Sequence, residues 1–92
     1  MAMKHNGLAK LCEECGELTQ VIGKMLQYPE LQETCSERHP DGTILRHRIE
    51  EELGDVIAAV EFVTQKLSLN REAIDERMLE KSELFETWST EP

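Results

Sequence analysis

The sequence predicts an all-α protein, a fold class indicated by composition and by hydrophobic periodicity. Helix-forming residues such as Glu, Leu and Ala are plentiful, while aromatic residues make up 4% of the 92-residue chain. Apolar residues recur at steps of three and four in three segments, the spacing of one helix face. We expect an antiparallel helical bundle of three main helices in a single domain, residues 1–92. Oligomerisation should complete it, because so short a chain buries a modest core.

The first helix is predicted from about Asn6 to Gln27. Its apolar stripe comprises Leu8, Leu11, Cys15, Leu18, Ile22 and Met25. Pro29 ends the helix, because the residue before a proline disfavours the α conformation. Gly16 and Gly23 each cost this helix roughly 1 kcal/mol relative to alanine, so we expect another helix to approach closely there.

The connection at residues 29–42 is polar, and its Pro-Asp-Gly run at 40–42 predicts a turn. Residues 30–37 are a candidate for one short extra helix. The second main helix is predicted to begin after Thr43 as its N-cap and to end near Leu67.

Apolar residues cover more than one side of this second helix. The main stripe comprises Ile49, Leu53, Val56, Ile57, Val60, Val63 and Leu67. Ala58, Ala59 and Phe62 add a second apolar side, so we expect a central helix with several neighbours.

The third helix is predicted to begin after Asn70, a favourable N-cap, with Glu72 well placed in its first turn. Its apolar positions are Ala73, Ile74, Met78 and Leu84 or Phe85. The final residues, 87–92, are interpreted as a tail.

Charge and apolar content exclude several classes of protein. A net charge of −9 argues against general affinity for nucleic-acid backbone, which needs a basic surface. No apolar run approaches the length of about 18 residues that a membrane span requires. Three cysteines and no recognisable signal peptide indicate a reducing, cytoplasmic setting.

Two acidic motifs, EECGE and EELGD, carry the strongest functional signal. They place carboxylates three residues apart, Glu14 with Glu17 and Glu52 with Asp55, and such residues are neighbours on a helix face. At about 100° per residue, Glu14 lies inside the apolar stripe and Glu17 at its edge. An acid buried there is costly unless it is paired or bound to a metal. Four such carboxylates suit Mg²⁺, with Mn²⁺ as a substitute.

Two other metal sites are disfavoured by the sequence. A di-iron carboxylate bundle needs Glu-x-x-His pairs, but Ala2, Ser36 and Ile44 stand three residues before the histidines. Cys12 and Cys15 form a C-x-x-C without a second Cys or His pair, so zinc is not expected. Cys15 is expected in the core.

The two acidic motifs together resemble those of the MazG-like all-α nucleoside triphosphate pyrophosphohydrolases. The family signature is Glu-Glu-x-x-Glu on one helix and Glu-x-x-Asp on the next, as in LCEECGELTQVIGK and IEEELGDVIAAVEFV. The resemblance implies Mg²⁺-dependent hydrolysis of a (deoxy)nucleoside triphosphate to the monophosphate and pyrophosphate. It also implies a homodimer or homotetramer, with metal ligands Glu14, Glu17, Glu52 and Asp55.

Further site residues are expected around the acids. Family members often carry a Lys and a later Arg on the third helix; Lys81 matches the Lys, and Arg77 could substitute for the Arg that does not follow. Candidate phosphate-binding residues are Lys10, Arg48, Arg77 and Lys81. Phe62 and Trp88 offer flat apolar faces for the base. One of the acids, or Glu13 or Glu51 beside them, is expected to accept the proton of the attacking water.

Two alternative functions remain open at this point. One is a non-catalytic acidic helical module that recruits a basic partner or regulates it. The other is a phosphoribosyl-ATP pyrophosphohydrolase, which uses the same chemistry on a different nucleotide.

Overall fold

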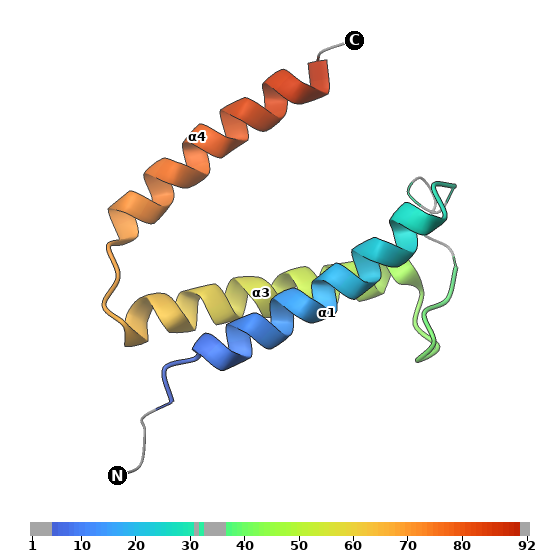
Figure 1. The fold of residues 1–92 in the computed structure, drawn as a ribbon, viewed down its shortest axis with the longest axis horizontal. Coiled ribbons are helices and arrows are strands. Elements are labelled where there is room, and N and C mark those ends of the chain that lie inside the picture. The colour runs from blue at the N-terminus through green and yellow to red at the C-terminus, as the bar shows by residue number, and fades with distance from the viewer. Residues whose placement is uncertain (1–4, 31, 33–36, 91–92) are drawn as a thin grey trace.

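In the computed structural model, residues 5–30, 32 and 37–90 are described, and three helices dominate them (Figure 1). The helices are α1 (Leu8–Gln27), α3 (Leu45–Lys66) and α4 (Arg71–Thr90). These residues contain no strand, only an isolated bridge between Arg38 and Ile44. The all-α prediction is confirmed, and the short helix expected at 30–37 falls largely outside the described residues.

The helix starts test the two predicted N-caps. The Asn70 cap is confirmed, because its side chain accepts a hydrogen bond from the Ala73 amide at 3.1 Å. The Thr43 cap is wrong: Ile44 is the N-cap of α3, and the Thr43 hydroxyl donates to Asp41. The N-cap of α1 is Gly7, and the Asn6 side chain accepts a hydrogen bond from the Leu8 amide at 3.0 Å. The predicted tail is also wrong through residue 90, since α4 continues to Thr90.

Helices α1 and α3 run antiparallel and pack along their length (Figure 1). The most buried apolar side chains between them are Val21 and Leu45, against which Met25 and Ile49 pack. A second buried group, Ala59 and Val63, lies further along α3. The acidic residues of both helices therefore lie between two apolar segments.

The apolar face of α1 is shifted from the predicted stripe. Val21 is buried, whereas Leu8, Cys15 and Ile22 are exposed. Val21, next to Ile22, turns toward α3 instead, because α3 is the helix that packs extensively on α1 among the described residues. The expectation that Cys15 lies in the core is wrong.

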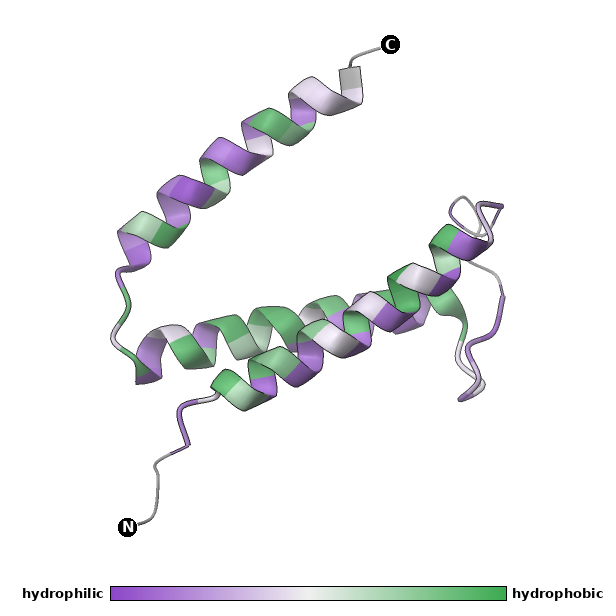
Figure 2. Ribbon diagram, viewed as in Figure 1, coloured by the Kyte–Doolittle hydropathy of each residue, from purple (hydrophilic) through white to green (hydrophobic). Residues whose placement is uncertain are grey.

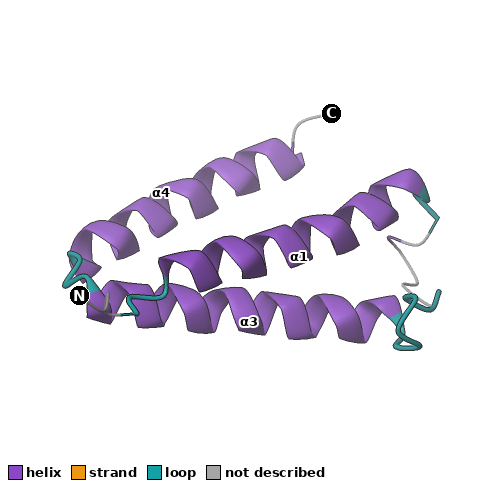
Figure 3. Cartoon of the chain, turned by 60° about the horizontal axis from the view of Figure 1, so that its bottom comes forward, coloured by secondary structure: helices purple, strands orange, loops and turns teal. Residues whose placement is uncertain are grey.

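Helix α4 leaves the end of α3 and diverges from the α1–α3 pair (Figures 1 and 3). Arg71 ties its first turn to α3 through Glu61 at 2.6 Å. Five of its large apolar side chains are exposed: Met78, Leu79, Leu84, Phe85 and Trp88. Figure 2 shows hydrophobic segments, in green, along this helix. The three-helix bundle is therefore not closed within one chain.

Candidate metal centre

The antiparallel packing of α1 and α3 brings the two acidic motifs together. Ligand oxygens of Glu14, Glu17, Glu52 and Asp55 all lie within 4.8 Å of one another, in a set that could hold a metal ion. Each helix contributes two acids three residues apart, so both carboxylates of a pair face the partner helix. The fold thus brings together the four acids that the sequence grouped, and their role as metal ligands stays a prediction.

Burial differs among the four acids. Glu52 is 1% exposed, and the Glu14 side chain is 12% exposed. Asp55, by contrast, is exposed. The Oε2 atoms of both Glu14 and Glu52 are buried and have no hydrogen-bond partner among the described residues. Unpaired buried carboxylate oxygens are costly, so these two atoms are candidate ligands for a cation.

The electrostatics of the cluster agree with this interpretation. Burial raises the pKa of Glu14, and the nearby Glu17 and Asp55 carboxylates raise it further. Burial likewise raises the pKa of Glu52, against the opposing charge of Arg48. Negative charge is thus in excess at the site, which is the condition that a bound cation relieves.

Two basic residues flank the acids. Lys10 Nζ lies 3.3 Å from Glu13 Oε1 and 4.0 Å from Glu14 Oε1. On the other helix, Arg48 Nη2 pairs with Glu52 Oε1 at 2.8 Å. Glu13 is exposed and lies outside the four-acid set, joined to it through Lys10.

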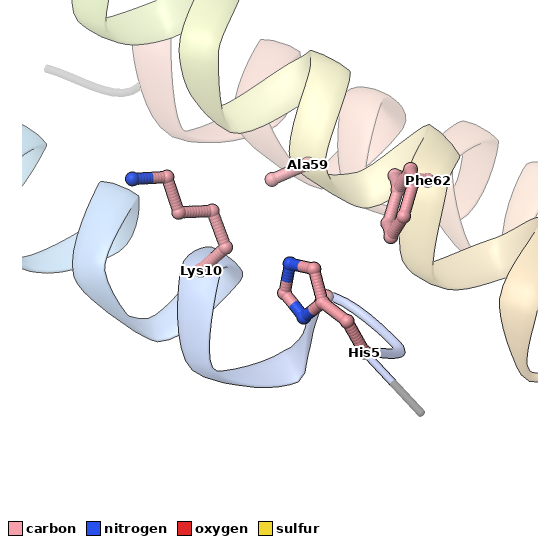
Figure 4. Close-up of a pocket in the computed structure, with 5 residues that line it drawn as sticks. His5, Lys10, Ala59 and Phe62 are labelled. Carbon is pink, nitrogen blue, oxygen red and sulfur yellow. The ribbon is translucent and has the colours of Figure 1, made fainter. Parts of the chain in front are cut away.

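A cavity of about 270 Å³ opens beside the cluster, one turn beyond Asp55 along α3 (Figure 4). The residues that line it are His5, Gly7, Lys10, Ala59 and Phe62. The His5 and Phe62 rings are 5.8 Å apart between centroids and tilted by 42°. His5 was not identified from the sequence, because nothing in its local pattern indicates that the N-terminal arm reaches α3.

Gly7 makes this approach feasible. Its φ of +87° is in the left-handed region, and a Cβ there would lie 2.5 Å from Phe62 Cδ1. Only glycine combines that backbone conformation with such proximity.

The predicted residues on α4 are not at the cluster in this chain. Arg77 pairs with Glu80 at 2.8 Å, and Lys81 lies over the Trp88 ring at 5.9 Å. Trp88 also contacts Phe85, with 5.1 Å between ring centroids. These contacts are all internal to α4. Cys12 and Cys15 are free and exposed.

Comparison with known proteins identifies the family of the chain. No curated protein and no solved structure matches the chain significantly. The family model of the MazG nucleotide pyrophosphohydrolase domain, however, matches residues 3–84, a range that includes both acidic motifs and most of the chain. The chain therefore belongs to the MazG nucleotide pyrophosphohydrolase family.

Proposed function

We propose that this protein hydrolyses a (deoxy)nucleoside triphosphate to the monophosphate and pyrophosphate, using Mg²⁺ bound by Glu14, Glu17, Glu52 and Asp55. The observation that carries the proposal is the cluster itself, four carboxylates from two helices with ligand oxygens within 4.8 Å of one another. Membership of a nucleotide pyrophosphohydrolase family supports the reaction class.

The donor set fits a hard divalent cation. All four side chains offer oxygen, the ligand type preferred by Mg²⁺ and acceptable to Mn²⁺. Two of the buried oxygens, one on Glu14 and one on Glu52, have no hydrogen-bond partner in the described part of the chain. When bound, such an ion supplies charge neutralisation for the phosphate oxygens and makes a water more acidic.

The chain's own residues then divide the remaining work. The Lys10 ammonium, at the edge of the cluster, is placed to bind a phosphate oxygen. Glu13, 3.3 Å from Lys10, is our candidate for the group that accepts the proton of the attacking water. As the water oxygen bonds to the α-phosphorus, the anhydride bond to the leaving pyrophosphate breaks.

The cavity between the N-terminal arm and α3 supports a base-binding role for Phe62. Its volume of about 270 Å³ is below the usual lower limit for a complete small-molecule pocket, ~300 Å³. We therefore assign it to the base alone, with the base against the Phe62 ring and His5 beside it. Lys10, which belongs to both cavity and cluster, connects the base end to the phosphate end.

Pyrophosphate release across the common NTPs and dNTPs, with Mg²⁺ and phosphoribosyl-ATP in the same panel, tests the proposal. We expect turnover of at least one triphosphate. The Asp55→Asn variant, purified in parallel, controls for a contaminating hydrolase. No turnover of any substrate at high protein concentration would overturn the triphosphatase assignment, and turnover of phosphoribosyl-ATP alone would replace it with the second alternative.

A non-catalytic acidic module explains less of the structure. A surface that recruits a basic partner needs exposed carboxylates, and most acids of this chain are exposed. It gives no reason for Glu52 to be 1% exposed with an unpaired oxygen beside three other acids.

A further inference from the structure

The carboxylate of Glu52 is held at one oxygen and open at the other. Its Oε1 pairs with Arg48 Nη2 at 2.8 Å, one helical turn away on α3. Its Oε2 is buried without a partner. A carboxylate fixed in this way by a guanidinium can present its second oxygen to a cation in one defined orientation.

Arg48 is in turn held by a residue outside the helix. Its Nη1 lies 3.3 Å from Asp41 Oδ2, in the connection that precedes α3. The guanidinium fork therefore joins Asp41 to Glu52, with three-quarters of the Arg48 side chain shielded from solvent. An ion pair of a flexible surface arginine contributes little to stability on its own. The Arg48 guanidinium is planar and pairs at both of its terminal nitrogens, so its orientation is fixed.

Asp41 is itself fixed by its own turn. It accepts hydrogen bonds from the Thr43 amide at 3.0 Å and the Thr43 hydroxyl at 2.7 Å. Those bonds, with the nearby His39 and Arg48, lower the pKa of Asp41 to about 2, so it stays ionised across the neutral range.

The turn is fastened to the rest of the chain. His39 and Thr43 are joined by an amide-to-carbonyl bond of 2.7 Å, and the Arg38 guanidinium donates to the Gly42 carbonyl at 2.7 Å. Lys24 of α1 donates to the Arg38 carbonyl at 3.1 Å. The loop between the two acid-bearing helices is therefore anchored to both of them.

We propose that the loop of residues 38–44 positions the metal ligand Glu52, through Asp41 and Arg48, and so sets the affinity of the site for its divalent cation. This inference rests on the proposed metal centre. Asp41 and Arg48 are positioning residues, because each acts through the next and neither belongs to the four-acid cluster.

The competing explanation is that Arg48 is only a counter-ion for a buried acid. In that case a lysine at position 48 would serve equally well, and Asp41 would be irrelevant. The two explanations differ in the coupling between Asp41 and Arg48, which a double-mutant cycle measures.

The test is Mn²⁺ binding to the nucleotide-free protein by isothermal titration calorimetry, for wild type, Asp41→Asn, Arg48→Lys and the double variant. Each single change should weaken binding by roughly tenfold, the lower end of the range for residues behind a metal ligand. The double variant should be no weaker than Arg48→Lys, because Asp41 acts only through Arg48. Arg46→Lys and Asp75→Asn, which alter exposed ion pairs, are matched controls and should bind as wild type does.

Each result decides a different claim. Affinities within twofold of wild type for both single variants, or losses that add in the double variant, would overturn the positioning role and leave the metal centre standing. Wild-type protein that binds no Mn²⁺ would overturn the metal centre and the positioning role together. Circular dichroism checks the fold of every variant, and if Arg48→Lys does not fold, Asp41→Asn decides alone.

Discussion

Glu14 and Glu52 combine burial with a surplus of negative charge. Both have one buried oxygen without a partner, and in both burial is the main cause of a raised pKa. Glu17, of intermediate burial like Glu14, and the exposed Asp55 complete the cluster. At the residue scale, burial in the cluster therefore decreases from Glu52 through the two acids of α1 to Asp55.

Replacing Glu14 with Gln should abolish triphosphate hydrolysis while retaining helicity. The amide keeps the shape of the side chain but removes a charged oxygen ligand. Steady-state rates and far-ultraviolet circular dichroism measure the two effects. Glu50→Gln is the matched control, since Glu50 is exposed on α3 and pairs with Arg46, away from the four-acid cluster. Near-normal rates in the Glu14 variant would show that the ligand assignment is wrong.

The raised pKa values also predict how stability without metal depends on pH. Glu14 and Glu52 have folded-state pKa values above their ordinary 4.5. As pH falls, the folded protein therefore takes up these protons at a higher pH than the unfolded chain does. Their contribution to stability is fully present below pH 4.5 and is lost as pH rises through the raised values. Asp41 behaves oppositely: its contribution is present above pH 3.8 and is lost as pH falls toward about 2.

Urea unfolding in EDTA at a series of pH values checks this, comparing wild type with the Glu14→Gln, Glu52→Gln double variant. Wild type should lose stability relative to the variant as pH rises from 4.5 toward neutrality. Saturating Mg²⁺ should reverse this loss, because the ion binds only the ionised folded site. A difference between the two proteins that does not change with pH would contradict the raised pKa values.

At the scale of the elements, periodicity located the helices because burial against one neighbour imposes a 3.6-residue repeat. The same angular argument placed Glu14 within the apolar stripe and grouped Glu52 with Asp55. It could not identify the role of Asp41, which depends on a turn folding back onto Arg48. The Thr43 cap failed for a related reason: its hydroxyl donates to Asp41 within the turn, and α3 begins one residue later, with Ile44 as its N-cap.

Two glycines, Gly7 at the N-cap of α1 and Gly23 within it, lead to a prediction about stability. Gly7→Ala should destabilise the protein by about 1–2 kcal/mol, because alanine must adopt a left-handed conformation and its Cβ would meet Phe62. Gly23→Ala should stabilise it by roughly 0.5–1 kcal/mol, since Gly23 lies within α1 and a Cβ there meets nothing within 4 Å.

Denaturant unfolding of both variants measures these changes. The predicted close approach of another helix at Gly16 and Gly23 is wrong within this chain, because both glycines face open space. A loss of stability in Gly23→Ala would contradict the monomer-based expectation and indicate that a second copy covers that face of α1.

On the scale of the whole molecule, one chain does not make a compact body. Its radius of gyration is 16.3 Å, whereas a compact domain of this length has a value of roughly 12 Å. The excess arises from α4, which packs on neither α1 nor α3 along its length (Figure 3). None of the described helices is long and apolar enough to cross a membrane.

A second copy of the chain is the partner we expect on this surface, giving a homodimer or homotetramer. Five large apolar side chains of α4 are exposed, and α1 and α3 expose others, including Ile22 and Ile57. So many exposed large apolar side chains are uncommon on a monomer and typical of a surface that another chain covers. In one chain Arg77 and Lys81 lie on the diverging helix α4. In an assembly, they could approach the four-acid cluster of a neighbouring copy.

Size-exclusion chromatography with light scattering should therefore give a dimer or tetramer for wild type. The Phe85→Ser, Trp88→Ser double variant removes the two largest apolar side chains of α4 and should shift the protein toward monomer, whereas Glu76→Gln on the same helix should not. Triphosphate hydrolysis should fall with the oligomer if Arg77 and Lys81 act on a neighbouring copy, while Mn²⁺ affinity at the α1–α3 cluster should change little. A stable wild-type monomer would contradict the assembly, and a fully active monomeric variant would remove α4 from the site.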